Sequence, residues 1–244
     1  MTTWNDLLKP GNANDFFTRE FPPFEPDATA YSRANAMWLA ELCRLVYRDD
    51  GRQQFLDRVN LKEVKPFNQE GTQAFLVEGP SFAALVFRGS DDLQAWFTNL
   101  KIRPDRLGNG VTVHTGFEEA LDVVWEEVTK SLGKVEKPCF FSGHSLGAAL
   151  ATIAASRIAP RALYTFGSPL VGNREFVDKL RIPIYRVDDG HDIVTTVPPA
   201  ELGYVHAGQV QLLHVKKGTL DHQSWFEPPE FLADHAPINY VERI

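Results

Sequence analysis

Short apolar runs alternate along the chain with longer segments in which apolar residues recur at helical spacing. The runs are typical of strands and lie at 74–77, 82–87, 138–141, 162–166, 184–187 and 210–215. The helical spacing predicts helices at 34–47, 117–131, 146–158 and 175–180. Because strands that are apolar along their whole length need cover on both faces, the alternation predicts an α/β fold. We expect a central, mostly parallel sheet with helices on both faces.

The first 30 residues follow a different pattern, rich in proline, asparagine and phenylalanine. This composition predicts an arm without regular helix, whose aromatic side chains pack on the rest of the chain. We find no internal repeat and no low-complexity linker, so we expect one domain over residues 1–244.

Composition limits the classes of protein that this chain can belong to. Its 244 residues are 43% hydrophobic, enough for one sizeable core, and the balance of 25 basic against 32 acidic residues gives a net charge of -7. This charge does not favour a nucleic-acid partner. No apolar run could span a bilayer and the first residues do not resemble a signal peptide, so we expect a cytoplasmic protein, or a secreted one whose export signal is absent from this sequence. Cys43 and Cys139 are predicted to be buried free thiols.

A Gly-x-Ser-x-Gly pattern, residues 143–147, lies between an apolar strand and an alanine-rich helix. A strand that reverses sharply into a helix needs small residues on both sides of the turn. Gly143 and Gly147 meet this need, so Ser145 is the candidate nucleophile, and the N–H of Leu146 is a candidate oxyanion donor. The alternative is an inert serine in a glycine-rich turn.

A nucleophilic serine also needs a histidine base and a carboxylate that orients the base. Three aspartates, Asp188, Asp189 and Asp192, follow the 184–187 strand at the carboxyl edge of the sheet and compete for the role of the acid. Most of the histidines are interpreted as packing residues, including His114, His144, His206 and His214. We predict no metal and no cofactor, because the sequence has neither a His-Glu-x-x-His pattern nor paired cysteines at zinc-site spacing.

Seven motifs, the Gly-x-Ser-x-Gly pattern and six others, occur in the order in which they occur in a known family. They are residues 86–90, 96–100, 113–117 and 143–147, then 165–172, then 192–194 ahead of Pro198-Pro199, followed by 206–208. Over roughly residues 34–244 the chain therefore resembles the class 3 lipases, the fungal-lipase-like branch of the α/β-hydrolases. The resemblance implies the α/β-hydrolase fold and hydrolysis of carboxylic esters of long-chain fatty acids. It also implies that Asp192 is the acid, so we interpret Asp188 and Asp189 as solvated turn residues. It further implies that the Ser90 N–H is the second oxyanion donor; Ser90 could also cap the helix after it.

Leu93, Trp96, Phe97 and Leu100 would form one apolar helical face directly after Ser90. In the fungal members of the family the matching segment is a lid that opens at an oil interface. A fixed helix packed on the core is equally consistent with this pattern, and the aromatic N-terminal arm is a second candidate cover.

Two Asp-His pairs compete for the base, Asp221-His222 and Asp234-His235. We favour His235, because a longer loop leads to it and because the segment after it reads as a helix that would anchor that loop. Pro237 suits the first helical position, and Ile238, Val241 and Ile244 form an apolar stripe.

The sequence as a whole thus predicts a serine-dependent lipase acting on acylglycerols at an oil–water interface, with Ser145, Asp192 and His235 as the triad. The alternatives are a phospholipase A1 or an aromatic-acid esterase on the same scaffold, and a non-catalytic hydrolase-like interaction protein.

Overall fold

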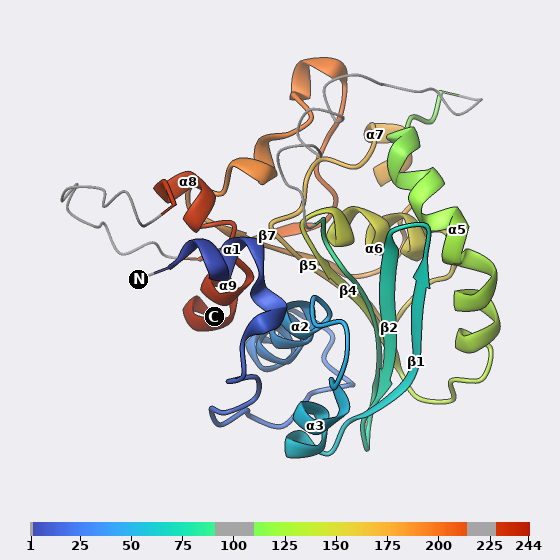
Figure 1. Cartoon of the computed structure of the whole chain (residues 1–244). Coiled ribbons are helices and arrows are strands. Elements are labelled where there is room, and N and C mark those ends of the chain that lie inside the picture. Colours follow the sequence, from blue (N-terminus) through green and yellow to red (C-terminus); the bar gives the residue numbers. More distant parts are fainter. Residues whose placement is uncertain (1, 91–109, 214–227) are drawn as a thin grey trace.

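A seven-stranded sheet forms the centre of the molecule (Figure 1). The structure is a computed structural model that describes residues 2–90, 110–213 and 228–244. The strands lie side by side in chain order: β1 (Lys62–Gln69), β2 (Thr72–Glu78), β3 (Ala83–Phe87), β4 (Cys139–His144), β5 (Ala162–Phe166), β6 (Ile184–Asp189) and β7 (Gln209–Leu213). The first three strands pair antiparallel and β3 to β7 pair parallel. The predicted mostly parallel sheet is therefore confirmed.

Strand β1 is the one strand of this sheet that the apolar pattern did not predict. Most of its side chains are exposed or only partly buried, with Phe67 the buried exception. A strand at the sheet edge can be this polar, because only a little of its surface meets the core. Its pairing with β2 rests on the backbone ladder, which leaves no apolar run in the sequence.

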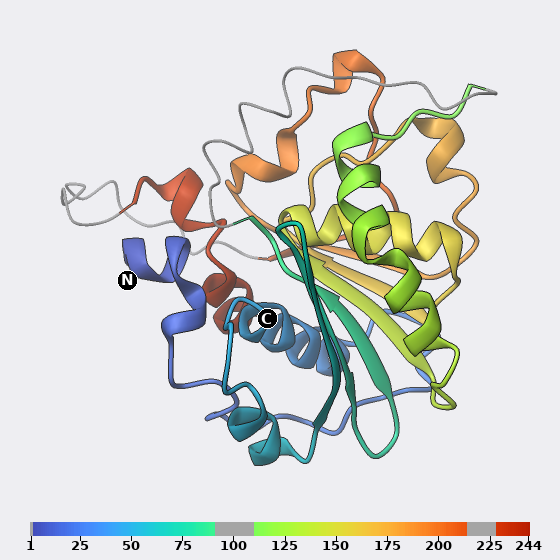
Figure 2. The same ribbon diagram turned by 45° about the vertical axis from the view of Figure 1, so that its right-hand side comes forward.

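Helices cover both faces of the sheet, as predicted (Figures 1 and 2). The α-helices of the described residues are α1 (Trp4–Leu8), α2 (Arg33–Leu45), α3 (Gln53–Leu56), α5 (Thr115–Leu132), α6 (Leu146–Arg157), α7 (Arg174–Val177), α8 (Glu230–Ala233) and α9 (Pro237–Arg243). Helices α5 and α6 pack on one face, and α2 and α9 lie on the other. Neighbouring strand residues alternate between the two cores, with Phe75 and Val86 on the α2 side and Leu76 and Leu85 on the α5 side. Within the residues described, no helix combines the length and apolar character needed to cross a membrane.

The N-terminal arm differs in part from its prediction. The expectation of no regular helix was wrong for α1, where the Thr3 hydroxyl accepts from the Asp6 N–H and the Asp6 carboxylate accepts from the Thr3 N–H. This reciprocal cap, a short polar signal, stabilises one turn of helix. The aromatic side chains of the arm pack inward: Phe16 is fully buried, and the ring of Phe24 stacks on Phe82 with centroids 3.6 Å apart.

The two cysteines are free thiols, as predicted. Cys43 is fully buried on α2, whereas Cys139 at the start of β4 is only partly buried. Burial raises the pKa of both thiols to about 12, so both stay protonated at neutral pH.

Parallel strands bring their carboxyl ends to one edge of the sheet. At this edge β3 leads into Ser90, β4 into Ser145, β5 into Gly167 and β6 into Asp192. The fold thus gathers four segments that are distant in sequence, and it does so next to α9 at the C-terminus.

Candidate active site

Ser145 occupies a sharp turn between β4 and α6. Its backbone φ is 59° and its ψ is -130°, a conformation that costs energy for a residue with a Cβ, and its N–H donates to the Phe166 carbonyl at 3.0 Å. The flanking glycines are required by close contact. A Cβ on Gly143 would lie 2.1 Å from the Gly147 carbonyl oxygen, and a Cβ on Gly147 would lie 2.2 Å from that of Phe87. The strand–turn–helix context predicted for this pattern is therefore present.

Asp192 and His235 form a buried pair. The His235 Nδ1 lies 2.8 Å from Oδ2 and 3.0 Å from Oδ1 of Asp192, and both side chains are almost completely buried. Because a carboxylate can only accept hydrogen bonds, Nδ1 carries a proton, and in the neutral ring the lone pair is then on Nε2. Asp192 Oδ1 also accepts from the N–H of Val194 at 2.8 Å, which fixes the carboxylate against its own turn. The ring of His235 is therefore held with Nε2 free to accept a proton.

Tyr240 on α9 is the third group bound to this pair. Its hydroxyl donates to Asp192 Oδ2 at 2.5 Å and accepts from the Asp189 N–H at 3.3 Å. Burial, and after it the charge of Asp192, raise the pKa of Tyr240 well above its usual range, so the hydroxyl keeps its proton. The sequence analysis missed this residue, because a tyrosine inside a predicted helix reads as core.

His144, interpreted from the sequence as a packing residue, connects the nucleophile turn to the base. Its Nε2 lies 2.8 Å from the His235 carbonyl oxygen, its Nδ1 lies 2.9 Å from the Tyr47 hydroxyl, and its ring is 4.5 Å from that of His235. A carbonyl only accepts, so Nε2 carries the proton and Tyr47 donates to Nδ1. Burial, and after it the repulsion that a protonated His235 exerts, lower the pKa of His144 well below its usual range. A neutral His144 thus holds the backbone of the candidate base.

The turn after β5 contacts both the nucleophile turn and the Asp192–His235 pair. The carbonyl of Phe166 accepts from the N–H of Ser145, and a Cβ on Gly167 would lie 2.6 Å from Asp192 Oδ2 and 3.1 Å from His235 Nδ1. Within the described part of the chain, the Ser145 Oγ and the His235 Nε2 are both buried without a hydrogen-bond partner. Arg186 Nε and Asp188 Oδ1 are also unpaired there, so what distinguishes these two atoms is that they belong to the candidate nucleophile and the candidate base.

The two candidate oxyanion donors lie on the elements that flank Ser145. Leu146 is the first residue of α6, and the first N–H groups of a helix have no partner inside it. Ser90 follows the end of β3, where the preceding Gly89 packs so closely that its Cβ would lie 3.1 Å from the Ser145 Cβ. Both backbone segments therefore border the nucleophile turn.

The interpretation of Asp188 and Asp189 as solvated turn residues was wrong. Strand β6 extends two residues beyond its predicted end and includes both, with Asp189 only 1% exposed. Each forms an ion pair, Asp188 with Arg186 and Asp189 with Arg243. Burial raises the pKa of Asp189 to about 6. The paired arginines, one of them 54 residues further along the chain, replace the solvation that the sequence analysis assumed.

The remaining histidines divide into described and undescribed ones. His114 is buried at the start of α5, and the partly buried His206 donates from Nε2 to the Thr195 carbonyl at 2.8 Å, so both serve packing as predicted. Burial is the main cause that lowers the pKa of His206 to about 4. His214 and the alternative base His222 lie outside the described residues, as do the lid candidates Leu93, Trp96, Phe97 and Leu100.

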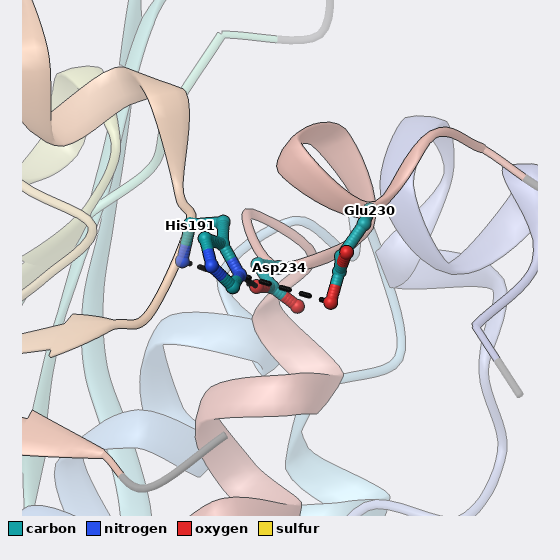
Figure 3. Close-up of side chains that lie close together, drawn as sticks. All are labelled: His191, Glu230 and Asp234. Atoms are coloured by element: carbon teal, nitrogen blue, oxygen red, sulfur yellow. Dashed lines mark hydrogen bonds and ion pairs between the residues drawn. The ribbon is translucent and has the colours of Figure 1, made fainter. Parts of the chain in front are cut away.

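One group of side chains in the described ranges could hold a metal ion, although no metal site was predicted. It consists of His191, Glu230 and Asp234 (Figure 3). His191 and Asp234 directly precede Asp192 and His235 in the sequence. Sequence patterns for metal sites could not find this group, because His191 is separated from the other two residues by about 40 positions.

Comparison with known proteins identifies the family. The family model for lipase (class 3) matches residues 84–202. Over 137 residues the chain is 40% identical to a secreted mono- and diacylglycerol lipase 1 of Fusarium solani, covering 49% of this chain and 40% of that protein. It is 32% identical over 159 residues to a lipase of Rhizomucor miehei, covering 57% and 44%. The chain thus matches less than half the length of these curated relatives.

A solved structure gives the fuller overlap. It is that of a triacylglycerol lipase whose catalytic centre is formed by a serine protease triad, with 30% identity and a TM-score of 0.59 over 65% of this chain and 69% of that one. The order of the motifs, the seven-stranded sheet and the strained serine turn agree with this match. The chain therefore belongs to the class 3 lipase family of the α/β-hydrolase superfamily.

Proposed function

We propose that this protein is a serine-dependent lipase that hydrolyses the carboxylic ester bonds of acylglycerols. One observation carries the proposal: a buried Asp192–His235 pair lies beside the strained turn of Ser145. Within the described ranges, both the His235 Nε2 and the Ser145 Oγ are buried without a hydrogen-bond partner. Such an arrangement supplies a nucleophile, a base and an orienting carboxylate. The similarity to a mono- and diacylglycerol lipase and to a triacylglycerol lipase supports acylglycerols as the substrate class.

In the proposed reaction the Ser145 Oγ attacks the carbonyl carbon of the ester while its proton passes to His235 Nε2. Asp192 holds the Nδ1–H of the same ring and stabilises the imidazolium that forms. The tetrahedral intermediate then collapses, its carbon–oxygen bond to the alcohol breaks, and His235 returns the proton to the departing alkoxide. Water, activated by the same histidine, attacks the acyl-enzyme and releases the fatty acid and free Ser145.

The negative charge of each intermediate needs donors aimed at its oxygen. We assign the N–H groups of Leu146 and Ser90 to this role, because both belong to segments that border Ser145. Donors held on rigid backbone cost no reorganisation when the charge forms, and removing one such donor costs about 10²- to 10³-fold in rate. The strained turn therefore serves two purposes: it presents the nucleophile at the edge of the sheet, and it places the first helical N–H beside it.

The site of action remains part of the proposal. Long-chain acylglycerols exceed their solubility at low concentration and form an oil–water interface, where we place this enzyme. The Fusarium solani relative is a secreted protein, which supports secretion over the cytoplasmic location that the sequence also allowed.

A substrate panel tests the proposed function. We would measure rates on p-nitrophenyl esters from short to long acyl chains, on emulsified triacylglycerol, on phospholipid and on an aromatic-acid ester, with Ser145→Ala as the matched blank. We expect the highest rate on acylglycerol and an increase in rate once the substrate forms an emulsion. A preference for phospholipid or for the aromatic-acid ester would replace the substrate class, and equal rates in wild type and Ser145→Ala would refute serine catalysis.

A further inference from the structure

His191, Glu230 and Asp234 bring three potential metal ligands to one point on the surface (Figure 3). The Nδ1 of His191 lies 3.6 Å from an oxygen of Asp234 and 3.7 Å from an oxygen of Glu230. The side chains of His191 and Glu230 are 62% and 50% exposed, whereas that of Asp234 is only 2% exposed. The group therefore combines one buried carboxylate, that of Asp234, with two side chains that are open to solvent.

The spacing of these atoms suits a shared metal ion better than direct hydrogen bonds. A hydrogen bond between a ring nitrogen and a carboxylate needs about 2.7–3.2 Å, which both contacts of His191 exceed. Two ligand atoms that are each about 2.1 Å from a tetrahedral ion lie about 3.4 Å apart. All three ligand atoms lie within 4.8 Å of one another, and the exposed Glu230 can move to shorten the longest separation.

Both carboxylate oxygens of Asp234 are held in place by hydrogen bonds. Its Oδ1 accepts from Arg243 at 2.8 Å, and Oδ2 accepts the backbone N–H of His191 at 3.2 Å, which directs Oδ2 toward the ring of His191. Outer contacts that orient a ligand typically raise metal affinity. Arg243 also pairs with Asp189, so its single positive charge is shared by two carboxylates, Asp189 and Asp234. Glu230 adds a third negative charge. The local balance is negative and attracts a cation.

We propose that His191, Glu230 and Asp234 form a binding site for a divalent transition-metal ion of the zinc type. One imidazole and two carboxylates suit Zn²⁺ or Co²⁺, whereas Mg²⁺ and Ca²⁺ prefer oxygen ligands alone. Solvent would complete the coordination on the open side. The site goes beyond ester hydrolysis and takes no part in it.

The position of the site gives a bound ion a structural consequence. His191 directly precedes Asp192, and Asp234 directly precedes His235. An ion held by both would tie the segment that carries the acid to the segment that carries the base. Because an ion that binds only the folded chain stabilises it, Zn²⁺ should raise the unfolding temperature.

The test measures metal binding on the full chain after removal of metal with a chelator. We would titrate Zn²⁺ by calorimetry and Co²⁺ by its visible absorption, and record the unfolding temperature with and without Zn²⁺. We expect one equivalent bound and a higher unfolding temperature in wild type, with Mg²⁺ at least tenfold weaker. His191→Ala and Glu230→Gln should each weaken Zn²⁺ binding at least tenfold and remove the thermal shift, while circular dichroism confirms that they fold, since both side chains are largely exposed.

Matched controls distinguish this group from other ligands in the chain. Glu201→Gln removes an exposed carboxylate outside the group, and His222→Ala removes another histidine; both should bind Zn²⁺ as wild type does. The proposal is overturned if wild type shows no saturable binding, if His191→Ala binds as tightly as wild type, or if His222→Ala is the variant that loses binding. No ester is present in these measurements, so their result is independent of the proposed lipase activity.

Discussion

The nucleophile turn and the acid–base pair are built in opposite ways. Ser145 is positioned by consecutive residues, with strand β4 before it and helix α6 after it. The two flanking glycines let neighbouring backbone segments pack so closely that there is no room for a Cβ. The Asp192–His235 pair is assembled from two segments 43 residues apart in sequence, and the hydroxyl of Tyr240 on the terminal helix donates to Asp192. One half depends on local backbone shape, and the other on buried polar contacts between distant segments.

Because of this difference, the two halves of the site should be sensitive to different kinds of substitution. A sterically defined turn tolerates changes in polarity but not added volume at its glycines. A buried polar cluster tolerates little loss of hydrogen bonding, because each carboxylate or imidazole left unpaired costs about 1–3 kcal/mol or more. Added volume in the turn should therefore lower stability, whereas loss of a hydrogen bond in the acid–base cluster should lower activity by misplacing the base.

The largest effect is expected at the nucleophile. Ser145→Ala should lower esterase activity on the order of 10⁴-fold or more while leaving the fold intact, because the backbone bond from its N–H to Phe166 remains. Gly143→Ala is the contrasting variant: its Cβ would lie 2.1 Å from the Gly147 carbonyl, so we expect lost stability. Rates on one soluble ester and unfolding temperatures separate the two. A Ser145→Ala variant that keeps a tenth of wild-type activity would refute the assignment.

The choice of base should give a similarly large effect. His235→Ala should cost about as much activity as Ser145→Ala, since members of a triad act as a unit. His222→Ala should stay within roughly tenfold of wild type. Both variants are compared on the same soluble ester after circular dichroism has confirmed that they fold. The reverse ranking would move the base to His222 and contradict the role that the Asp192 contact gives to His235.

A smaller effect is expected at Tyr240, which positions Asp192 rather than reacting. Tyr240→Phe removes one donor to a buried carboxylate, a bond worth about 1.5–3 kcal/mol, so kcat should fall by roughly tenfold to a hundredfold with KM little changed. Tyr164→Phe is the matched control, because it also removes a buried hydroxyl contact, the one that accepts from the Ser32 N–H at 3.2 Å. Equal losses of kcat in both variants would show a general packing effect and would exclude a specific role for Tyr240.

The same contrast explains what the sequence could predict. The α/β fold, the strand–turn–helix around Ser145 and the terminal helix from Pro237 follow from apolar periodicity and local sterics, which are properties of contiguous residues. The pairing of Asp189 with Arg243 and the bond from Tyr240 to Asp192 depend on which distant side chains meet in the folded chain. The pattern of residues in a single sequence does not indicate such long-range contacts.

The polar edge strand β1 and the short helix α1 show a second limit. Both form without an apolar run, β1 through its ladder with β2 and α1 through the reciprocal cap between Thr3 and Asp6. Hydrophobic patterning finds elements that are half buried or more, so it misses those stabilised mainly by backbone pairing and caps. The Thr3-x-x-Asp6 spacing is a signal that could have revealed α1.

The smallest effect concerns pH, where the titrations of Asp189 and His206 should change stability in opposite directions. Asp189 has a pKa raised to about 6, so its contribution to stability is present below its ordinary value of 3.8 and is lost as pH rises through 6. His206 has a pKa lowered to about 4, so its contribution is present above 6.5 and is lost as pH falls through 4. Acidification from pH 6.5 to 4 therefore weakens the fold through His206 while Asp189 offsets part of that loss.

Removing Asp189 should expose this balance. In Asp189→Asn the offset is gone, and the fall in unfolding temperature between pH 6.5 and 4 should be steeper than in wild type by roughly 2–4 °C, the change expected for about 1 kcal/mol in a domain of this size. The slope is the measurement, because the lost contact with Arg243 shifts the temperature at every pH. Asp178→Asn, at an exposed aspartate on the surface, should keep the wild-type slope. An Asp189→Asn slope equal to or shallower than that of wild type would show that burial does not hold a proton on Asp189 in this range.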